Sequence, residues 1–217
     1  MDEVIEKGKR MSEKLYTLLM SLETNYFFAD SKVALKKVIH KMINGGTPST
    51  NEGKFYSNGT IPWITTKTLN NDYTLHGEKL ITLEAINKSA AKILPKGNIL
   101  AGTRVGVGKF SINKIDISFS QDINGLFIET DFVDVDYLLF QLKSNSVQNK
   151  IKPLLRGTTI KGILKDDLLN LKITLPEKAI QIKVAKNLKY LKTAILEIES
   201  KIGFSKSLQK NLINQIF

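Results

Sequence analysis

Residues 45–67 of this chain read GGTPSTNEGKFYSNGTIPWITTK, and this stretch decides which folds are open to the protein. The glycine pair at 45–46 and Pro48 break a helix, and Asn58-Gly59 is typical of a hairpin-type turn. The run Ile61–Ile64 predicts a strand that enters the core with its proline at the edge. On this interpretation the tryptophan of that run, the only one of the chain, is buried and does not stack on a ligand.

The composition places the chain among basic globular proteins. Its 217 residues carry 32 Lys and Arg against 21 Asp and Glu, a net charge of +11. This length allows one domain of about 150 residues plus additional helices. No apolar run approaches the ~18 residues of a membrane span, and the acidic start MDEVIEKGKR is unlike a signal peptide. We therefore expect a cytoplasmic protein that makes no use of a membrane.

The positive charge is unevenly distributed along the chain. Residues 1–28 have a net charge of −1, residues 29–176 of +7 and residues 177–217 of +5. A basic body of this kind fits a polyanionic partner such as nucleic acid. A lysine-rich surface without a specific partner explains the charge equally well.

Heptad patterns predict a long helix at each end of the chain, because apolar positions alternate in steps of four and three. In residues 1–28 these positions are Val4, Gly8, Met11, Leu15, Leu18 and Leu22. In residues 177–217 they are Val184, Leu188, Leu191, Ile195, Ile198 and Ile202, after which Gly203 interrupts the pattern. Isolated helices of this length are marginal in water. We expect the two to pair with each other, with a second copy of the chain, or both; packing on the body as ordinary core helices is the alternative.

Residues 33–176, between the helices, predict a compact α+β domain with a mixed sheet. The expected strands are Ile61–Thr65, Asn98–Ala101, Phe110–Ile112, Ile115–Ser120, Gly125–Glu129 and Leu171–Leu175. We expect a helix over Val135–Ser144, and a short helix or a turn over Lys165–Asn170. The chain then divides into a helix (1–28), a mixed-sheet domain (33–176) and a second helix (177–217).

The glycine-rich run Ala101–Phe110, AGTRVGVGKF, resembles a phosphate-binding loop without matching one. Five residues separate Gly102 from the Gly108-Lys109 pair, where a P-loop has four, and no Ser or Thr follows. We predict instead a tight hairpin that presents Arg104 and Lys109.

No catalytic or metal motif is visible. Cysteine is absent, and His40 and His76 lack the spacing of metal ligands. Asp134 and Asp136 stand at a predicted helix start, where a capping role is simplest. We therefore expect no enzyme activity, no metal and no cofactor.

Two clusters suit contact with DNA. The run 121–125 places Gln121 and Asn124 beside a turn, and the run 156–162, RGTTIKG, combines Arg156, Thr158 and Lys161 in a glycine-bounded loop. Arginine can pair with guanine, and glutamine or asparagine with adenine. Turn chemistry for Asn124 and solvation for Lys161 are the alternatives, and Arg156 could instead form an ion pair with an aspartate at 166 or 167.

Eight motifs occur in an order that resembles the target recognition domain of the specificity subunits of type I restriction–modification enzymes. They are GGTPS (45–49), IPWI (61–64), IT (81–82), SAAKILPKG (89–97), TRVGVGK (103–109), QD (121–122), GTTIKGI (157–163) and LKITLP (171–176). The likeness covers residues from about 35 to 190. Each motif alone is weak, whereas the ordered series is specific.

The resemblance implies a subunit that reads DNA sequence, has no catalytic centre of its own, and docks a DNA methyltransferase subunit and in some systems a restriction subunit. Family members usually carry two recognition domains separated by helices, and this chain has one. We therefore expect a homodimer with antiparallel helices that binds two inverted half-sites. The alternative is a half that needs a different half as its partner.

The candidate residues divide by role. Arg104, Gln121 and Asn124 are predicted near base edges, with Thr158 and Lys67 as weaker candidates. Phosphate contacts are predicted for Lys54, Tyr56, Lys109, Arg156 and Lys161. Dimer contacts are predicted for Leu15, Leu18, Leu22, Leu188, Leu191, Ile195, Ile198 and Ile202. The lysines Lys183, Lys186, Lys189 and Lys192 are predicted to form an outer basic face of the second helix. A protein-interaction adaptor that uses its helices and binds no DNA remains the alternative function.

Overall fold

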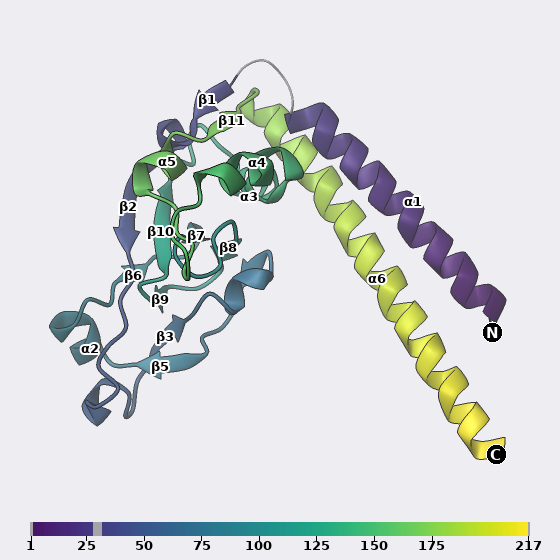
Figure 1. Ribbon diagram of the computed structural model, residues 1–217, viewed down its shortest axis with the longest axis horizontal. Coiled ribbons are helices and arrows are strands. Elements are labelled where there is room, and N and C mark those ends of the chain that lie inside the picture. The colour runs from purple at the N-terminus through teal and green to yellow at the C-terminus, as the bar shows by residue number, and fades with distance from the viewer. Residues whose placement is uncertain (1, 28–31, 217) are drawn as a thin grey trace.

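The structure, a computed structural model, describes residues 2–27 and 32–216. Two long helices, α1 (Asp2–Phe27) and α6 (Lys178–Ile216), lie side by side and project from the rest of the chain (Figure 1). We call this pair the helical arm and the remainder, residues 32–177, the body. Among the described residues no helix is long and apolar enough to cross a membrane.

The two helices of the arm are antiparallel and pack along a heptad seam. Contacts along its length join residues whose numbers sum to about 210: a Cβ on Gly8 would lie 2.8 Å from Ile202, and Gln209 donates a hydrogen bond to Asp2 at 2.7 Å. The pairing within one chain that the heptads predict is therefore confirmed. The C-terminal helix is also continuous through Gly203, where the pattern predicted an interruption.

In α1, three of the six predicted seam positions are wrong by one residue: the next residue along the chain is buried instead. Val4, Met11 and Leu18 are 65%, 47% and 46% exposed. The buried side chains are instead Ile5, Ser12 and Leu19, which alternate with Gly8, Leu15 and Leu22. The heptad of α1 supports either phase, because an apolar residue stands at both members of the pairs 4–5 and 18–19.

The pairing within the chain occupies most of the residues predicted as dimer contacts. Of the eight residues, only Leu18 is exposed. The other seven lie in or beside the seam within the chain: Leu15, Leu22, Leu188, Leu191, Ile195, Ile198 and Ile202. The exposed faces of the arm are those outside this seam.

Three sheets form the body. A five-stranded sheet has the order β2-β10-β7-β8-β4, with β2 (Ile39–Asn44), β10 (Ile123–Ile128), β7 (Ile99–Gly102), β8 (Phe110–Asn113) and β4 (Tyr73–Thr74). A four-stranded sheet has the order β5-β3-β9-β6, with β5 (Lys79–Ile81), β3 (Ile61–Ile64), β9 (Ile117–Phe119) and β6 (Ile93–Leu94). The third sheet pairs β1 (Lys32–Ala34) with β11 (Lys172–Thr174).

Short helices complete the body. The α-helices are α2 (Leu83–Lys88), α3 (Val135–Lys143), α4 (Asn145–Ile151) and α5 (Lys165–Leu169). The 3-10 helices are Leu35–Val38, Gly53–Phe55, Thr68–Asn70 and Lys152–Leu154. Asp134 caps α3 by accepting a hydrogen bond from the Tyr137 amide at 2.8 Å, as its place before the helix predicted.

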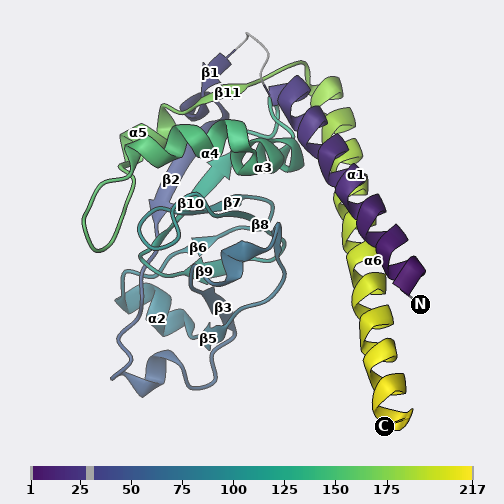
Figure 2. The same ribbon diagram turned by 45° about the vertical axis from the view of Figure 1, so that its right-hand side comes forward.

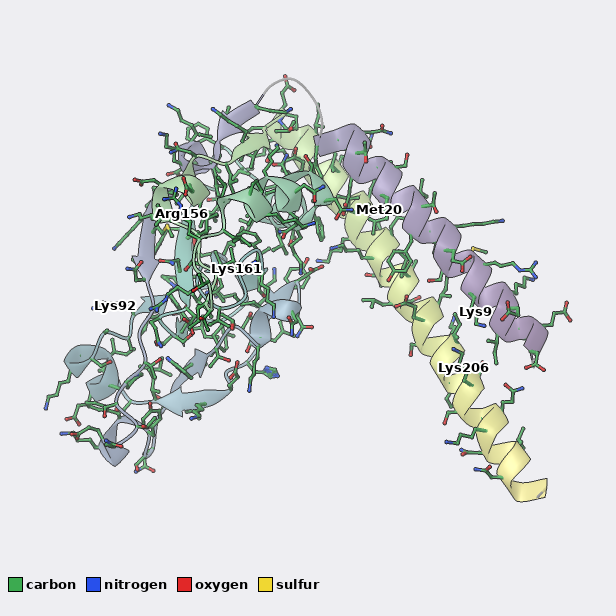
Figure 3. The ribbon with its side chains drawn as sticks, in the orientation of Figure 1. Lys9, Met20, Lys92, Arg156, Lys161 and Lys206 are labelled. Atoms are coloured by element: carbon green, nitrogen blue, oxygen red, sulfur yellow. The ribbon has the colours of Figure 1, made fainter. Side chains whose placement is uncertain are left out.

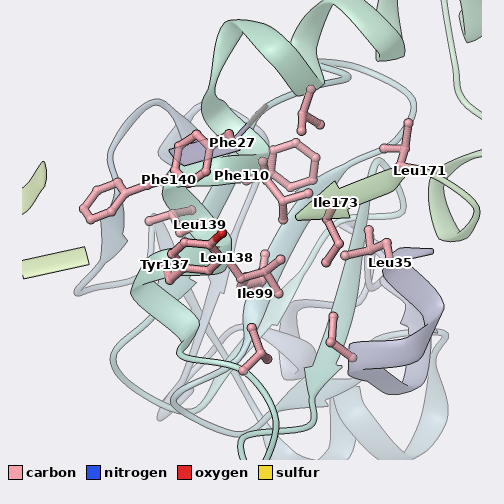
Figure 4. Close-up of a cluster of buried hydrophobic side chains, with 14 of the residues drawn as sticks. Phe27, Leu35, Ile99, Phe110, Tyr137, Leu138, Leu139, Phe140, Leu171 and Ile173 are labelled. Atoms are coloured by element: carbon pink, nitrogen blue, oxygen red, sulfur yellow. The ribbon is translucent and has the colours of Figure 1, made fainter. Parts of the chain in front are cut away.

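The main core lies between the five-stranded sheet, α3 and the start of α6. Ile99 and Phe110 of the sheet pack with Tyr137 and Leu138 of α3 (Figure 4). Phe27, at the end of α1, reaches the same core, where its ring meets the Tyr137 ring edge-on with centroids 5.5 Å apart. The arm is thus anchored in the body at the end where its two helices meet it (Figure 2).

A glycine pair lets the chain cross the four-stranded sheet at close range. A Cβ on Gly45 would lie 2.2 Å from the Ser120 carbonyl oxygen, and one on Gly46 would lie 2.3 Å from the Ala90 backbone. The Trp63 indole donates a hydrogen bond to the Gly46 carbonyl at 3.0 Å. Trp63 is 6% exposed, so its predicted burial is confirmed.

The strand around Trp63 is not an edge strand, since β3 lies between β5 and β9. Its proline is tolerated because pairing with β9 involves only Trp63 and Ile64, so that Pro62 faces no β9 partner. All six predicted strands are present within one residue at each end, except that the start of β9 and the start of β10 each move by two residues.

Replacing Gly45 by alanine is expected to lower the free energy of unfolding by about 1–3 kcal/mol, because the new methyl group meets a backbone oxygen that cannot move aside. Chemical denaturation measures the change. Gly203→Ala is the matched control: a Cβ there has open space, and alanine in place of helical glycine should add about 0.5–1 kcal/mol. Equal stability of Gly45→Ala and the wild type would contradict the close approach.

Candidate nucleic-acid interface

Five loops of the body are tied together, and we call them the loop surface. They comprise residues 47–57, 65–68, 103–109, 120–123 and 156–163. Thr47 donates a hydrogen bond to the Gln121 side chain. The amides of Thr103 and Ile163 bond to the carbonyls of Asp122 and Thr103, both at 2.9 Å. Backbone bonds thus connect loops that are far apart in sequence.

The loop between β7 and β8 is the tight hairpin that its glycines predicted. A Cβ on Gly102 would lie 2.2 Å from the Gly106 oxygen, and Gly106 and Gly108 adopt φ values of 72° and 86°, which favour glycine. Gln148 of α4 braces the loop by donating to the Gly108 carbonyl at 2.9 Å. The loop displays the Arg104 side chain, which is 61% exposed and 3.9 Å from an Asp122 oxygen.

The loop of residues 156–163 is closed by its own backbone. Arg156 and Gly162 exchange two N–H to carbonyl bonds of 2.8 Å, and Gly157 has a φ of 107°. Thr158 and Lys161 are exposed in this loop, and Figure 3 shows Lys161 and Arg156 on the body, away from the arm. Arg156 forms the ion pair with Asp167 that was one of its two predicted roles, at 3.1 Å.

Lys67 is carried by a loop that Glu78 holds in place. The Glu78 carboxylate accepts hydrogen bonds from the Thr65 amide at 3.0 Å and from the Thr68 hydroxyl at 2.6 Å. Burial raises the pKa of Glu78, but these hydrogen bonds outweigh it and the pKa lies below its ordinary value. The carboxylate is therefore ionised at neutral pH, and the Lys67 side chain beside it is exposed.

Lys54 and Tyr56 stand at one end of the loop surface. The Lys54 ammonium lies 3.4 Å from Glu52 and 3.6 Å from Glu84, so its charge is shared with carboxylates. The Tyr56 hydroxyl donates to the Pro48 carbonyl at 2.7 Å. These contacts fix the two side chains within the fold and leave less of them available to a partner than of Lys67 or Lys161.

Asn124 lies beneath the loop surface. It is 8% exposed, and its amide donates to the Thr103 hydroxyl. We had predicted this side chain near a base edge, as a neighbour of Gln121. Because β10 already begins at Ile123, Asn124 points into the sheet region and braces Thr103, whereas Gln121 is exposed.

Sequence reasoning did not find three of the supporting residues. Glu78 and Gln148 are single polar residues with no pattern around them, and Thr47 was visible only as part of the GGTPS motif. Their roles depend on contacts across 74, 13 and 40 residues of sequence. Asp122 was visible as part of the Gln-Asp pair, but the hydrogen bonds that its carbonyl accepts were not.

The four lysines predicted to form an outer basic face of α6 have different surroundings in the structure. Lys192 bonds to Asp72 of the body at 3.2 Å, and the Lys189 ammonium lies 5.1 Å from the centre of the Tyr73 ring. Lys183, Lys186 and Lys189 are all exposed. Three of the four lysines therefore remain on an outer face, and Lys192 alone is joined to the body by an ion pair.

The exposed side chains of the loop surface have the chemistry of a nucleic-acid contact. The exposed Lys67 and Lys161 and the half-buried Lys109 have no acidic oxygen within 4.0 Å among the described residues, which suits contact with phosphates. Arg104 and Gln121 are side chains that can pair with base edges. In the part of the chain that the structure describes, no group of three His, Asp or Glu side chains could hold a metal ion.

Comparison with known proteins defines the class. Residues 31–203 match the family described as type I restriction modification DNA specificity domain. The chain is 33% identical over 157 residues to the MjaIX specificity subunit of Methanocaldococcus jannaschii, covering 71% of this chain and 36% of that protein. It is 28% identical over 155 residues to the EcoR124I/EcoR124II specificity subunit of Escherichia coli, covering 69% of this chain and 38% of that protein.

The fold has solved counterparts. The whole chain superposes on the HsdS subunit from Thermoanaerobacter tengcongensis with a TM-score of 0.73 and 19% identity, and covers 54% of that structure. The chain belongs to the family of type I restriction–modification specificity subunits, as its ordered motifs predicted. It spans about half the length of the solved structure and a little over a third of the curated relatives it matches.

Removing the brace from the 103–109 loop is expected to loosen it without unfolding the body. Gln148→Ala deletes the hydrogen bonds to the Gly108 and Leu142 carbonyls, so amide hydrogen exchange in residues 104–109 should become faster. Asn149→Ala is the control, because Asn149 is exposed on the same helix. Unchanged exchange in the loop of the Gln148 variant would show that its glycines alone define it.

Proposed function

We propose that this chain is a sequence-reading DNA-binding subunit with no catalytic activity of its own. The observation that carries the proposal is the loop surface, where exposed basic and amide side chains stand on loops fixed by backbone hydrogen bonds. Lys67, Lys109 and Lys161 contact phosphates and set the affinity. Arg104 and Gln121 read base edges, with Thr158 beside them.

The proposed assembly is a homodimer that binds two identical, inverted half-sites. A specificity subunit of this kind directs a DNA methyltransferase subunit, and a restriction subunit where present, to the bipartite site. A two-fold axis in the protein would match the palindrome in the DNA.

The helical arm offers a surface for the second copy. Val4, Met11 and Leu18 form an exposed apolar row on α1, and Phe204 and Leu208 of α6 are 71% and 41% exposed. Gln209 lies opposite Asp2 at the start of α1. The last turns of α6 therefore extend past α1 and have no partner helix in the described part of the chain, which suits pairing between two copies.

Two single substitutions are expected to distinguish a side chain that reads a base pair from one that strengthens binding to any DNA sequence. Arg104→Ala should weaken binding to the preferred half-site by about 1–3 kcal/mol and relax discrimination at one base pair. Lys161→Ala should weaken binding to all sequences alike and reduce the slope of log affinity against log salt by about one. Fluorescence anisotropy over a salt series, with half-site variants, measures both effects.

Lys206→Ala on the arm is the matched control, since it removes one positive charge far from the loop surface (Figure 3). It should leave the salt slope and the discrimination unchanged. Double-stranded DNA binding by the wild type with no salt dependence, or none at all, would favour the protein-interaction adaptor over a DNA-reading subunit.

Introducing a charge into the apolar row is expected to dissociate the dimer. Met11→Glu and Leu18→Glu place carboxylates where apolar side chains would be buried between copies. Light scattering at tens of micromolar should report a dimer for the wild type and a monomer for each variant. Leu83→Glu, at an exposed leucine of the body, should remain dimeric; a wild type that is strictly monomeric would contradict the assembly.

A further inference from the structure

Contacts between the body and α6 run from the first turns of the helix to Lys192, and polar groups stand at both ends of this stretch. The upper contact is at the first turns, where the Gln181 side chain accepts from the Asp134 amide at 2.9 Å and donates to two carbonyls. Val184 and Leu188 pack into the core beside it. This contact is buried and apolar, and it fixes where the arm begins.

The lower contact is ionic and centres on Asp72. Its carboxylate lies in the connection before β4 and binds two ammonium groups, Lys143 at the end of α3 and Lys192 of α6, the latter at 3.2 Å. The side chains of all three are between 23% and 26% exposed. One ion thus joins the arm to the body and at the same time to α3.

Aromatic rings lie beside the Lys192 ammonium and beside those of two further lysines. The Lys192 ammonium lies 4.6 Å from the centre of the Phe140 ring, and Lys189 and Lys114 approach the Tyr73 ring at 5.1 and 4.5 Å. The Tyr73 hydroxyl donates to Asp136 at 2.9 Å. Tyr73 is therefore held by α3, so the position of Asp72 next to it is fixed relative to the body.

The environment keeps Asp72 ionised. Burial raises its pKa, but the hydrogen bond from Lys143 and the charge of Lys192 together outweigh burial, and the pKa lies below its ordinary value. Glu23 of α1 faces the same cluster, and its pKa lies above its ordinary value because burial outweighs the opposing charge of Lys192. Both helices of the arm therefore contribute an ionisable side chain to this junction.

Packing around the lower contact is incomplete. A cavity of about 340 Å³ is lined by Tyr73, Phe140, Lys189 and Leu196 among others. A second cavity of about 290 Å³ is lined by Tyr16, Leu19 and Asn71 among others. Asp72 and Lys192 line both. The ionic contact therefore joins the arm to the body at a place where apolar packing leaves space.

The two contacts together define an angle. Gln181 and Lys192 are eleven residues apart on one helix, which is about 16 Å at 1.5 Å per residue. With both contacts in place the body is held at two levels along α6. Without the lower contact we expect the body to turn more freely about the start of α6, because the cavities leave space beside it.

We propose that the Asp72–Lys192 contact is a specificity-determining device that holds the body at one angle to the arm and so limits the spacer lengths that the dimer accepts between half-sites. This inference rests on the proposed function. One added base pair moves a half-site by about 3.4 Å and turns it by about 35°. Only a stiff connection between arm and body converts that small change into lost binding.

The test begins with the full-length wild type and a library of random double-stranded DNA, from which the bipartite site is selected and sequenced. The selected half-sites are then placed at spacers from four base pairs shorter to four longer, and binding to each is measured by competition. The wild type should prefer one spacer over its neighbours by about tenfold or more. Lys192→Met, which keeps the apolar stem on Phe140, should reduce that ratio to about threefold or less.

Three further proteins make the result specific. Lys192→Arg keeps the charge and should restore the narrow spacer preference. Lys186→Met, an exposed lysine of the same helix, should leave it unchanged. Asp72→Asn removes the same contact from the other side and should broaden the preference as Lys192→Met does. All variants should bind a single half-site with the affinity of the wild type.

The outcomes separate the two levels of the argument. A wild type that selects no sequence would overturn the proposed function. A wild type that selects half-sites but shows no spacer preference, or one with a narrow preference that Lys192→Met and Asp72→Asn both retain, would overturn this inference alone. Broadening in either folded variant, as judged by an unchanged circular dichroism spectrum and half-site affinity, supports the role of the contact.

Discussion

The antiparallel pairing of α1 with α6 is the constraint on which the rest of the structure depends. It brings the two ends of the chain together, with Gly8 against Ile202 and Asp2 against Gln209. It also delivers Phe27 to the Tyr137 ring, so that the arm and the core of the body share one apolar cluster. Because the seam residues of α1 and α6 pack against each other within the chain, the faces of the arm left for other proteins are those outside the seam.

Much of the fold could be predicted because its signals are local. Six strands (β3, β7, β8, β9, β10 and β11) and α3 follow from apolar runs bounded by glycine, asparagine and aspartate, and α6 as far as Ile202 follows from its heptad pattern. The strands β1, β2, β4, β5 and β6 were not predicted; β4, β5 and β6 are two or three residues long, which leaves little alternation to recognise. The heptad phase predicted for α1 was wrong for another reason. Val4 and Ile5 are equally suitable for a seam, and only contact with the partner helix decides between them.

The loop surface was predictable in composition but not in detail. The runs TRVGVGK and RGTTIKG predicted glycine-bounded loops with exposed cations, and Arg104 and Lys161 are exposed. Gln121, from the run 121–125, is exposed as well. Burial of Asn124 and the pairing of Arg156 with Asp167 depend on side-chain contacts that no spacing encodes. The Asp72 junction is the same kind of case, because its three charges come from segments 71 and 120 residues apart.

The way in which the loops are fastened has an evolutionary consequence. The bonds that close the 156–163 loop, and that join it to Thr103, run between backbone groups. Such bonds form whatever side chains the exposed positions carry. Thr158, Ile160 and Lys161 can therefore be exchanged with little cost to stability, since surface substitutions away from packed features change it by about 0.5 kcal/mol or less. Under the proposed function, a lineage built on this scaffold would acquire a new target sequence by substituting loop residues while its core stays the same.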